Sequence, residues 1–225
     1  MNNLVQSIYV RYMQLLGDDS LEFPKDGYHG DYVIDIAKEL LEEYEDELKE
    51  GNFQDKIAIK KFGESWCFDR IKETLSKMNI EQDVFYNEDS LYKEGKINEV
   101  IEDLKEKNLI YEKDGATWLK LSEMGLESDR VIVKSSGEPT YRLPDIAYHK
   151  EKFKRGFDKI IDVFGADHIA TIPDVMAAVK HLGYKTENIE VVIHQFVTLT
   201  KDGKQVKMSK RTGKSYTLDD LLEEV

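Results

Sequence analysis

The chain has 225 residues, of which 40% are hydrophobic, and a formal net charge of -13. This length and composition can bury the core of one large globular domain or two small ones. The acidity argues against a general nucleic-acid coat, because phosphate backbones require basic surface, so any contact with nucleic acid has to be local. No apolar run approaches the length of a membrane span, and the N-terminus lacks the features of a signal peptide, so we expect a cytoplasmic protein without a membrane partner.

Helices dominate the first part of the chain. Apolar residues recur at three- and four-residue intervals from Leu4 to a stop at Gly17, and again over 33–44, where the stripe is the clearest helix signal in the sequence. The single cysteine, Cys67, has no partner for an internal disulfide and is predicted to pack within a third helix. That helix is predicted over 64–78, with a buried face formed by Phe68, Ile71, Leu75 and Met78.

The pattern then changes to a small mixed unit of helix and strand. A helix is predicted to begin near Asn98. Two short apolar runs, at 109–111 and 116–119, flank an Asp-Gly pair at 114–115 that is typical of a tight hairpin turn. The sequence therefore predicts a helix followed by a β-hairpin.

Strands and helices alternate from Asp129 onward. Short apolar strands that alternate with helices indicate a parallel sheet, whose ligands bind beyond the carboxyl ends of the strands. Residues 165–168, Gln195 and a lysine-rich loop all follow predicted strands. The predicted strands cover 131–133, 159–164 and 189–193, and the predicted helices begin near Pro144 and Pro173.

The lysine-rich loop, residues 200–214, reverses the charge of the chain. It carries six basic residues and one acidic residue, so an anionic ligand is expected there. Lys207 and Lys210 stand close enough in sequence to grip a polyphosphate together, because each lysine supplies a compact charge with three donors. The alternative is a solvated hairpin tip rich in lysine.

A last helix is predicted to start at Thr217. Asp220 follows three residues later, as in a capping box. The predicted helix has room for only about two turns, so we expect the chain to be a piece of a longer protein.

Five sequence motifs, taken in their order and spacing, carry a family resemblance. The chain resembles the catalytic region of class I aminoacyl-tRNA synthetases, and specifically the bacterial type of arginyl-tRNA synthetase. The motifs are GYHGDY at 27–32, TYRLPDIAYH at 140–149, GADH at 165–168, HQFV at 194–197 and KMSKR at 207–211. The last matches the class signature Lys-Met-Ser-Lys-Ser except for Arg211, which leaves both lysines in place.

The resemblance implies an α/β fold in two parts. Residues 129–225 would form the C-terminal half of a Rossmann-like nucleotide-binding domain, and 1–128 an inserted or connective region, mainly helical, with a small α+β unit. The second class signature, His-x-Gly-His, is absent from the sequence. A helical anticodon-binding domain would follow the lysine loop in the family. The fragment is therefore expected to be inactive alone, since half of the phosphate clamp would lie elsewhere.

The resemblance also assigns residues to sites. Lys207 and Lys210 would be catalytic, stabilising the triphosphate while the arginine carboxylate attacks its α-phosphorus. The implied arginine-binding residues are Glu88, Tyr141, Asp145 and His168. The implied ATP-binding residues are Gly165, Asp167, His168, Gln195, Phe196, Lys207, Met208, Ser209 and Lys210.

Carboxylates suit an arginine site, because a planar guanidinium presents a fork of donors that a carboxylate meets with two parallel hydrogen bonds. Asp145 stands four residues after Tyr141, close to one helical turn. Simpler interpretations stay open: Asp145 as an acid near a helix N-terminus, Glu88 as a surface loop residue, Asp167 as the residue that orients His168, and Gln195 as an ordinary strand exit.

The implied activity is that of arginine–tRNA ligase. Arginine would be activated with ATP and Mg²⁺ to arginyl-adenylate, in the presence of tRNA, and transferred to tRNA(Arg) by a monomeric parent protein. No protein metal site is predicted, and His29, His149 and His181 are interpreted as polar surface or helix residues. The alternatives are a class I synthetase of other specificity, and a non-catalytic relative that binds tRNA or a protein.

Overall fold

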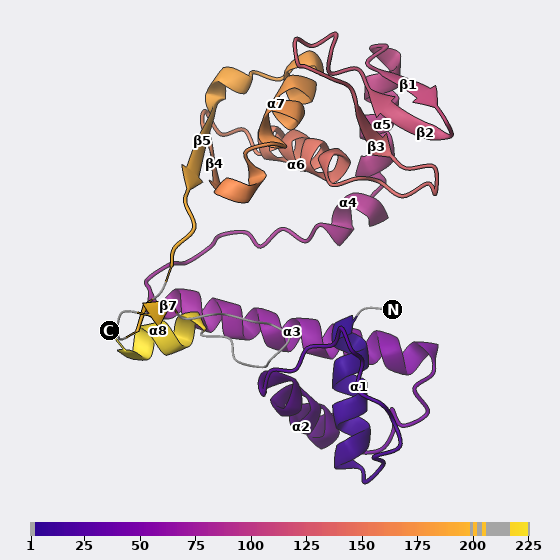
Figure 1. Ribbon diagram of the computed structural model, residues 1–225, viewed down its shortest axis with the longest axis vertical. Helices are drawn as coiled ribbons and strands as arrows, with labels where there is room; N and C mark the ends of the chain where they lie inside the picture. The colour runs from indigo at the N-terminus through magenta and orange to yellow at the C-terminus, as the bar shows by residue number, and fades with distance from the viewer. Residues whose placement is uncertain (1–2, 199, 202–203, 206–216, 225) are drawn as a thin grey trace. The chain divides into compact units, whose positions relative to one another are not determined.

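The computed structural model describes residues 3–198, 200–201, 204–205 and 217–224 (Figure 1). The chain forms two compact units: Met1–Asp83 together with Thr198–Val225, and Val84–Val197. Helices combine with small sheets, as the predicted α/β class requires. The sequence predicts a boundary between residues 128 and 129, which is not where the compact units divide. That boundary separates the inserted region from the nucleotide-binding half of a synthetase, and it stays a prediction.

The first unit is mainly helical. Tyr12 of its first helix lies in the core, and its hydroxyl donates to the backbone oxygen of Glu45 over 2.6 Å. The apolar stripes predicted from the sequence meet in this core, which includes Val5, Ile8, Val33, Ile36, Ala37, Leu40 and Ile59. The elements are α1 (Asn3–Leu15), α2 (Tyr32–Tyr44), α3 (Phe53–Lys77), β6 (Thr200–Lys201), β7 (Lys204–Gln205) and α8 (Leu218–Glu224).

The third helix is longer than the sequence predicts. A start at residue 64 is wrong, because α3 begins at Phe53 behind a complete capping box. The Asn52 side chain accepts from the backbone of Asp55 over 3.1 Å, and the Asp55 carboxylate accepts from the backbone of Asn52 over 3.1 Å. Gly63 lies inside the helix where it packs closely on α1. A Cβ there would lie 2.5 Å from Cδ1 of Ile8, so a larger residue would push that side chain aside.

The predicted apolar face of α3 is only partly buried. Phe68 is 42% exposed and Ile71 is 49% exposed, so the prediction that they belong to the core is wrong. Leu75 and Met78 are half-buried. Cys67 packs against the helical core, as predicted. The apolar spacing of the helix therefore extends beyond the part that α1 and α2 cover.

Helix α8 ends the described chain against α3. The predicted capping pair is present, with Asp220 accepting from the backbone and hydroxyl of Thr217, each over 2.7 Å. Asp219 accepts from Thr74 over 2.8 Å and from Lys77 over 2.9 Å. Both partners stand near the end of α3.

The second unit combines helices with two sheets. Asp114 and Gly115 both have positive φ, at 53° and 73°, which produces the predicted hairpin between β1 and β2. The elements are α4 (Asp89–Lys93), α5 (Lys96–Glu106), β1 (Ile110–Lys113), β2 (Ala116–Leu119), β3 (Arg130–Val133), α6 (Arg142–Lys154), β4 (Ile160–Gly165), η1 (Ala166–His168), α7 (Ile172–His181), η2 (Thr186–Asn188) and β5 (Ile189–His194).

Strand β3 corrects the predicted parallel sheet. It pairs antiparallel with β2, giving a sheet in the order β1-β2-β3. Only β4 and β5 of the three strands predicted after Asp129 are parallel to each other, in a register that joins Gly165 to His194. Alternation of strands and helices does not reveal that the hairpin captures the next strand.

One core joins the three-stranded sheet of the second unit to its helices. It is formed by buried side chains of α4, α5, β2, β3, α6 and α7, among them Leu91, Leu104, Leu119, Ile132, Ile146 and Val179. Figure 1 shows α6 and α7 lying between the two sheets. Across the part of the chain that the structure describes, no helix has the length and apolar character to cross a membrane.

Candidate functional site

The carboxyl end of β4 carries the predicted GADH motif. The strand ends at Gly165, and η1 then brings the His168 ring over Phe164, with 5.6 Å between the ring centroids. A Cβ on Gly165 would lie 2.7 Å from Oδ1 of Asp167, so a larger residue would displace that carboxylate. Asp167 and His168 are both exposed, and 3.9 Å separates Oδ2 of Asp167 from Nε2 of His168. That distance is too long for a hydrogen bond.

A hollow between α6, β4 and α7 adjoins His168. It is small, about 10 Å³, and both apolar and titratable side chains line it. The lining residues are Asp145, His149, Phe164, His168, Thr171, Ile172, Val175 and Met176. The hollow therefore joins two of the four predicted arginine-binding residues, Asp145 and His168.

Glu88 acts on the same carboxyl group. Desolvation by the surrounding protein raises the pKa of Asp145, and the charge of Glu88 raises it further. His149, His168 and Lys152 act in the opposite direction. The structure thus brings Glu88 and His168 within electrostatic reach of Asp145, although Asp145 and Glu88 are both exposed. Two neighbouring carboxylates repel each other, and a bound cation would relieve that repulsion.

A buried ion cluster fixes the helix that carries Asp145. Nδ1 of His149 donates to the backbone oxygen of Asp145 over 2.7 Å, and Nε2 lies 2.8 Å from Oδ2 of Asp162. Lys152 donates to Oδ1 of Asp162 over 2.5 Å. Burial by itself would raise the pKa of Asp162, but the hydrogen bonds from His149 and Lys152 and their charges hold it below its usual value.

Sequence reasoning missed this cluster. His149 is a residue of α6, as one of its two interpretations had it, but it is 3% exposed, so the surface interpretation is wrong. Two signals could have found it. His149 follows Asp145 by four residues, one helical turn, and Asp162 occupies an inward position of an alternating strand.

Of the predicted site residues that the structure describes, only Asp145 and His168 line the hollow. Tyr141 precedes α6 and is 87% exposed. Gln195 and Phe196 follow β5, and Phe196 is 76% exposed. Gln195 and Phe196 lie beyond a strand end, as the sequence predicts, and line neither this hollow nor the larger one beside β4. Lys207, Met208, Ser209 and Lys210 lie outside the described residues.

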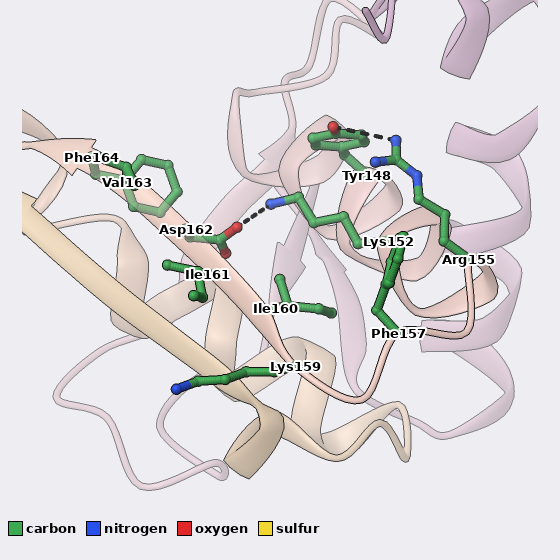
Figure 2. A pocket seen from close by; sticks show the side chains of 10 residues that line it. All are labelled: Tyr148, Lys152, Arg155, Phe157, Lys159, Ile160, Ile161, Asp162, Val163 and Phe164. Atoms are coloured by element: carbon green, nitrogen blue, oxygen red, sulfur yellow. Dashed lines mark hydrogen bonds and ion pairs between the residues drawn. The ribbon is translucent and has the colours of Figure 1, made fainter. Parts of the chain in front are cut away.

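A second, more open hollow of about 380 Å³ follows β4 and the end of α6 (Figure 2). Lys152 reaches Asp162 across it, and Arg155 donates to the Tyr148 hydroxyl over 3.4 Å. Ile161 and Val163 line it and are 58% and 65% exposed. None of the predicted site residues lines it. In the described part of the chain, no three His, Cys, Asp or Glu side chains are placed to hold a metal ion.

Comparison with known proteins agrees with the motifs. The profile of a family described as "tRNA synthetases class I (R), catalytic domain" matches residues 25–225. The chain is 51% identical to an arginine–tRNA ligase from Desulfotalea psychrophila and 46% identical to one from Bacillus subtilis, in each case over all of this chain and 40% of the relative.

A solved structure extends this agreement. A crystal structure described as a putative arginyl-tRNA synthetase from Campylobacter jejuni superposes with a TM-score of 0.87 at 34% identity, covering 99% of this chain and 48% of that one. The chain thus spans 40% of the length of the curated relatives that it matches. By its profile match, its identity to these ligases and its fold, the chain belongs to the arginyl-tRNA synthetase family of class I catalytic domains.

Proposed function

We propose that this chain supplies the arginine-binding part of an arginine–tRNA ligase. The observation that carries the proposal is the placement of Asp145 and His168 around one hollow beside β4, with the charge of Glu88 acting on the Asp145 carboxyl group. A guanidinium is a planar cation with donors in a fixed fork, and paired carboxylates are the groups that bind it best. The full reaction uses ATP, arginine and tRNA(Arg), and the chain would contribute to it as one part of a longer enzyme.

The finer fold assignment follows from the same edge of the sheet. We propose that β4, α7 and β5 belong to the second half of a Rossmann-like domain, with 1–128 as the inserted region. Parallel strands joined by a helix are the unit of that fold. Exposed apolar side chains on both strands, including Ile161, Val163, Val192 and Ile193, suit a sheet that continues into further chain.

ATP would be gripped by Lys207 and Lys210 on the proposed assignment. Each lysine would place a positive charge where negative charge develops on the phosphates. Gly165, Asp167, Gln195 and Phe196 are proposed to face the nucleotide, because they all stand at carboxyl ends of the parallel strands. Mg²⁺ would accompany ATP through its phosphates.

The central experiment is arginine binding by the full-length enzyme, measured by calorimetry. Asp145→Asn keeps the shape of the side chain and removes its charge. It is expected to weaken arginine binding about 10- to 100-fold, as loss of a charge-assisted hydrogen-bonded pair does. Asp158→Asn, which changes an exposed carboxylate outside the hollow, is the matched control. Lysine and glutamine should bind far more weakly than arginine.

The pH dependence gives a second readout. Only ionised Asp145 pairs with a guanidinium, and its pKa is raised in the folded protein. Arginine affinity should therefore fall as the pH drops, starting above the ordinary aspartate value of about 3.9. Asp145→Asn should remove that part of the pH dependence. Unchanged arginine affinity in the Asn variant would disprove the assignment.

A further inference from the structure

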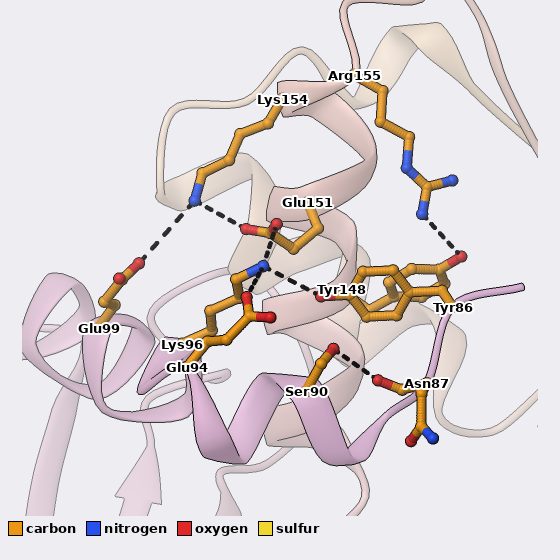
Figure 3. A network of polar contacts seen from close by, with 10 residues as sticks. All are labelled: Tyr86, Asn87, Ser90, Glu94, Lys96, Glu99, Tyr148, Glu151, Lys154 and Arg155. Carbon is orange, nitrogen blue, oxygen red and sulfur yellow. Dashed lines mark hydrogen bonds and ion pairs between the residues drawn. The ribbon is translucent and has the colours of Figure 1, made fainter. Parts of the chain in front are cut away.

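A cluster of aromatic and charged side chains joins the segment before α4 to helix α6 (Figure 3). The Tyr86 ring packs on the Tyr148 ring with 4.7 Å between centroids. Lys96 donates to Oε2 of Glu151 over 2.6 Å and to the Tyr86 hydroxyl over 3.3 Å. We call Tyr86, Lys96, Tyr148 and Glu151 the tyrosine-lysine clamp.

The clamp is better shielded than an ordinary surface ion pair. The Lys96 side chain is 18% exposed and that of Glu151 is 14% exposed. Hydrogen bonds that the Lys96 amine donates to Glu151 and Glu94 raise its pKa, which keeps it charged at neutral pH. The Arg155 guanidinium lies 5.6 Å from the Tyr86 ring and 5.5 Å from the Tyr148 ring, which adds a cation to the aromatic pair.

Glu88 lies two residues after Tyr86, so the clamp fixes the segment from which it projects. Local bonds complete the anchorage. The Asn87 side chain accepts from the backbone of Asp89 over 2.9 Å, and the Ser90 hydroxyl donates to the backbone oxygen of Asn87 over 2.7 Å. Leu91, which is 1% exposed, buries the following turn in the core. Glu88 itself is exposed, and its side chain does not cap α4.

We propose that the tyrosine-lysine clamp positions Glu88 against Asp145 and thereby sets the affinity of the site for arginine. The clamp holds both parts of the carboxylate pair: Tyr86 and Lys96 flank α4, whereas Tyr148 and Glu151 stand on α6 one to two turns after Asp145. Its residues touch no ligand. They are positioning residues whose effect passes through Glu88. The inference rests on the proposed role of Glu88 in arginine binding.

The test is a double-mutant cycle in the full-length enzyme, read as arginine affinity by calorimetry. Lys96→Met keeps the length of the side chain and removes its charge and donors. It should weaken arginine binding about 10-fold, and Glu88→Gln should weaken it at least as much. Once Glu88 has been replaced, Lys96→Met should cause no further loss, because the clamp then has no carboxylate to position.

Two further variants separate positioning from general destabilisation. Lys105→Met removes an exposed lysine of α5 whose amine lies 3.9 Å from Glu102, and it should leave arginine affinity unchanged. Glu151→Gln removes the acceptor of the clamp on α6 and should weaken arginine binding as Lys96→Met does. It replaces Lys96→Met in the test if the Lys96 variant folds poorly. Thermal unfolding of each variant checks that it is folded. In steady-state aminoacylation, the KM for arginine should rise while kcat changes little.

The outcomes distinguish the two proposals. If Glu88→Gln weakens binding but Lys96→Met and Glu151→Gln do not, the clamp has no positioning role and the arginine site stands. If Lys96→Met weakens arginine binding equally in the wild type and in the Glu88→Gln variant, its effect does not pass through Glu88 and the inference is wrong. If Glu88→Gln has no effect, the assigned role of Glu88 fails, and the inference fails with it, while the test on Asp145 stands separately.

Discussion

Asp162 is expected to be the most sensitive single carboxylate of the second unit. It is 6% exposed and faces two donors, Nε2 of His149 at 2.8 Å and Nζ of Lys152 at 2.5 Å. Asp162→Asn keeps one oxygen that can accept one of these bonds. The other donor then faces an amide NH₂, so at least one charge-assisted bond of about 1.5–3 kcal/mol is lost. Leaving Lys152 without a counter-charge adds to this, and we expect a total of about 3 kcal/mol.

The assay is urea unfolding of the 225-residue chain, followed by Trp118 fluorescence in a Trp66→Phe background. Trp118 belongs to β2, in the same compact unit as Asp162, so its emission reports on that unit. The matched control is Glu190→Gln on the neighbouring strand. Glu190 forms an exposed ion pair with Lys159, and its replacement should change the free energy of unfolding by less than about 0.5 kcal/mol.

The pH dependence of the difference follows from the lowered pKa of Asp162. A carboxyl group with a depressed folded-state pKa stabilises the protein above its unfolded pKa, about 3.9, and loses that contribution as the pH falls through the folded value. The difference in free energy of unfolding between wild type and Asp162→Asn should therefore be largest at neutral pH and disappear only below about pH 4. A loss no larger than that of Glu190→Gln at pH 7 would refute the reasoning.

Two further predictions concern the first unit. Asn52→Ala removes the side-chain acceptor of the capping box and should lower the free energy of unfolding by about 1 kcal/mol, by Trp66 fluorescence in urea, whereas Asn52→Ser should retain most of it; equal losses would contradict the capping assignment. Burial, and secondarily the charge of Glu64, raises the pKa of the Cys67 thiol, so it should react with Ellman's reagent at pH 8 more slowly than free cysteine, and equally fast in denaturant; fast reaction of the folded chain would contradict this.

The sequence predicted those elements whose signals are local. The stripe over 33–44 became α2, and the Asp-Gly pair at 114–115 formed the hairpin turn. The pair of Thr217 and Asp220 capped the last helix. In each case neighbouring residues carry the whole signal. Where the signal is distant, prediction failed: the start of α3 was misplaced beyond Gly63, whose tolerance inside a helix depends on Ile8 of α1.

The candidate site divides along the same line. Its residue types could be predicted, because motifs and the chemistry of a guanidinium point to Glu88, Asp145 and His168. Their convergence depends on the fold, which brings α4 and η1 to the start of α6. Tyr141 shows the converse: its spacing from Asp145 suggests a shared pocket wall, yet it is 87% exposed at the helix start.

By itself, the sequence determined the family, the type of chemistry and most of the helices, because motifs, charge and periodicity are properties of neighbouring residues. Only the tertiary structure decided which strands pair and which charges are buried. It joined β3 to an antiparallel sheet and enclosed His149 with Asp162. Strand pairing and burial are determined by contacts between residues far apart in the chain, and the energy of those contacts depends on the solvent that folding excludes.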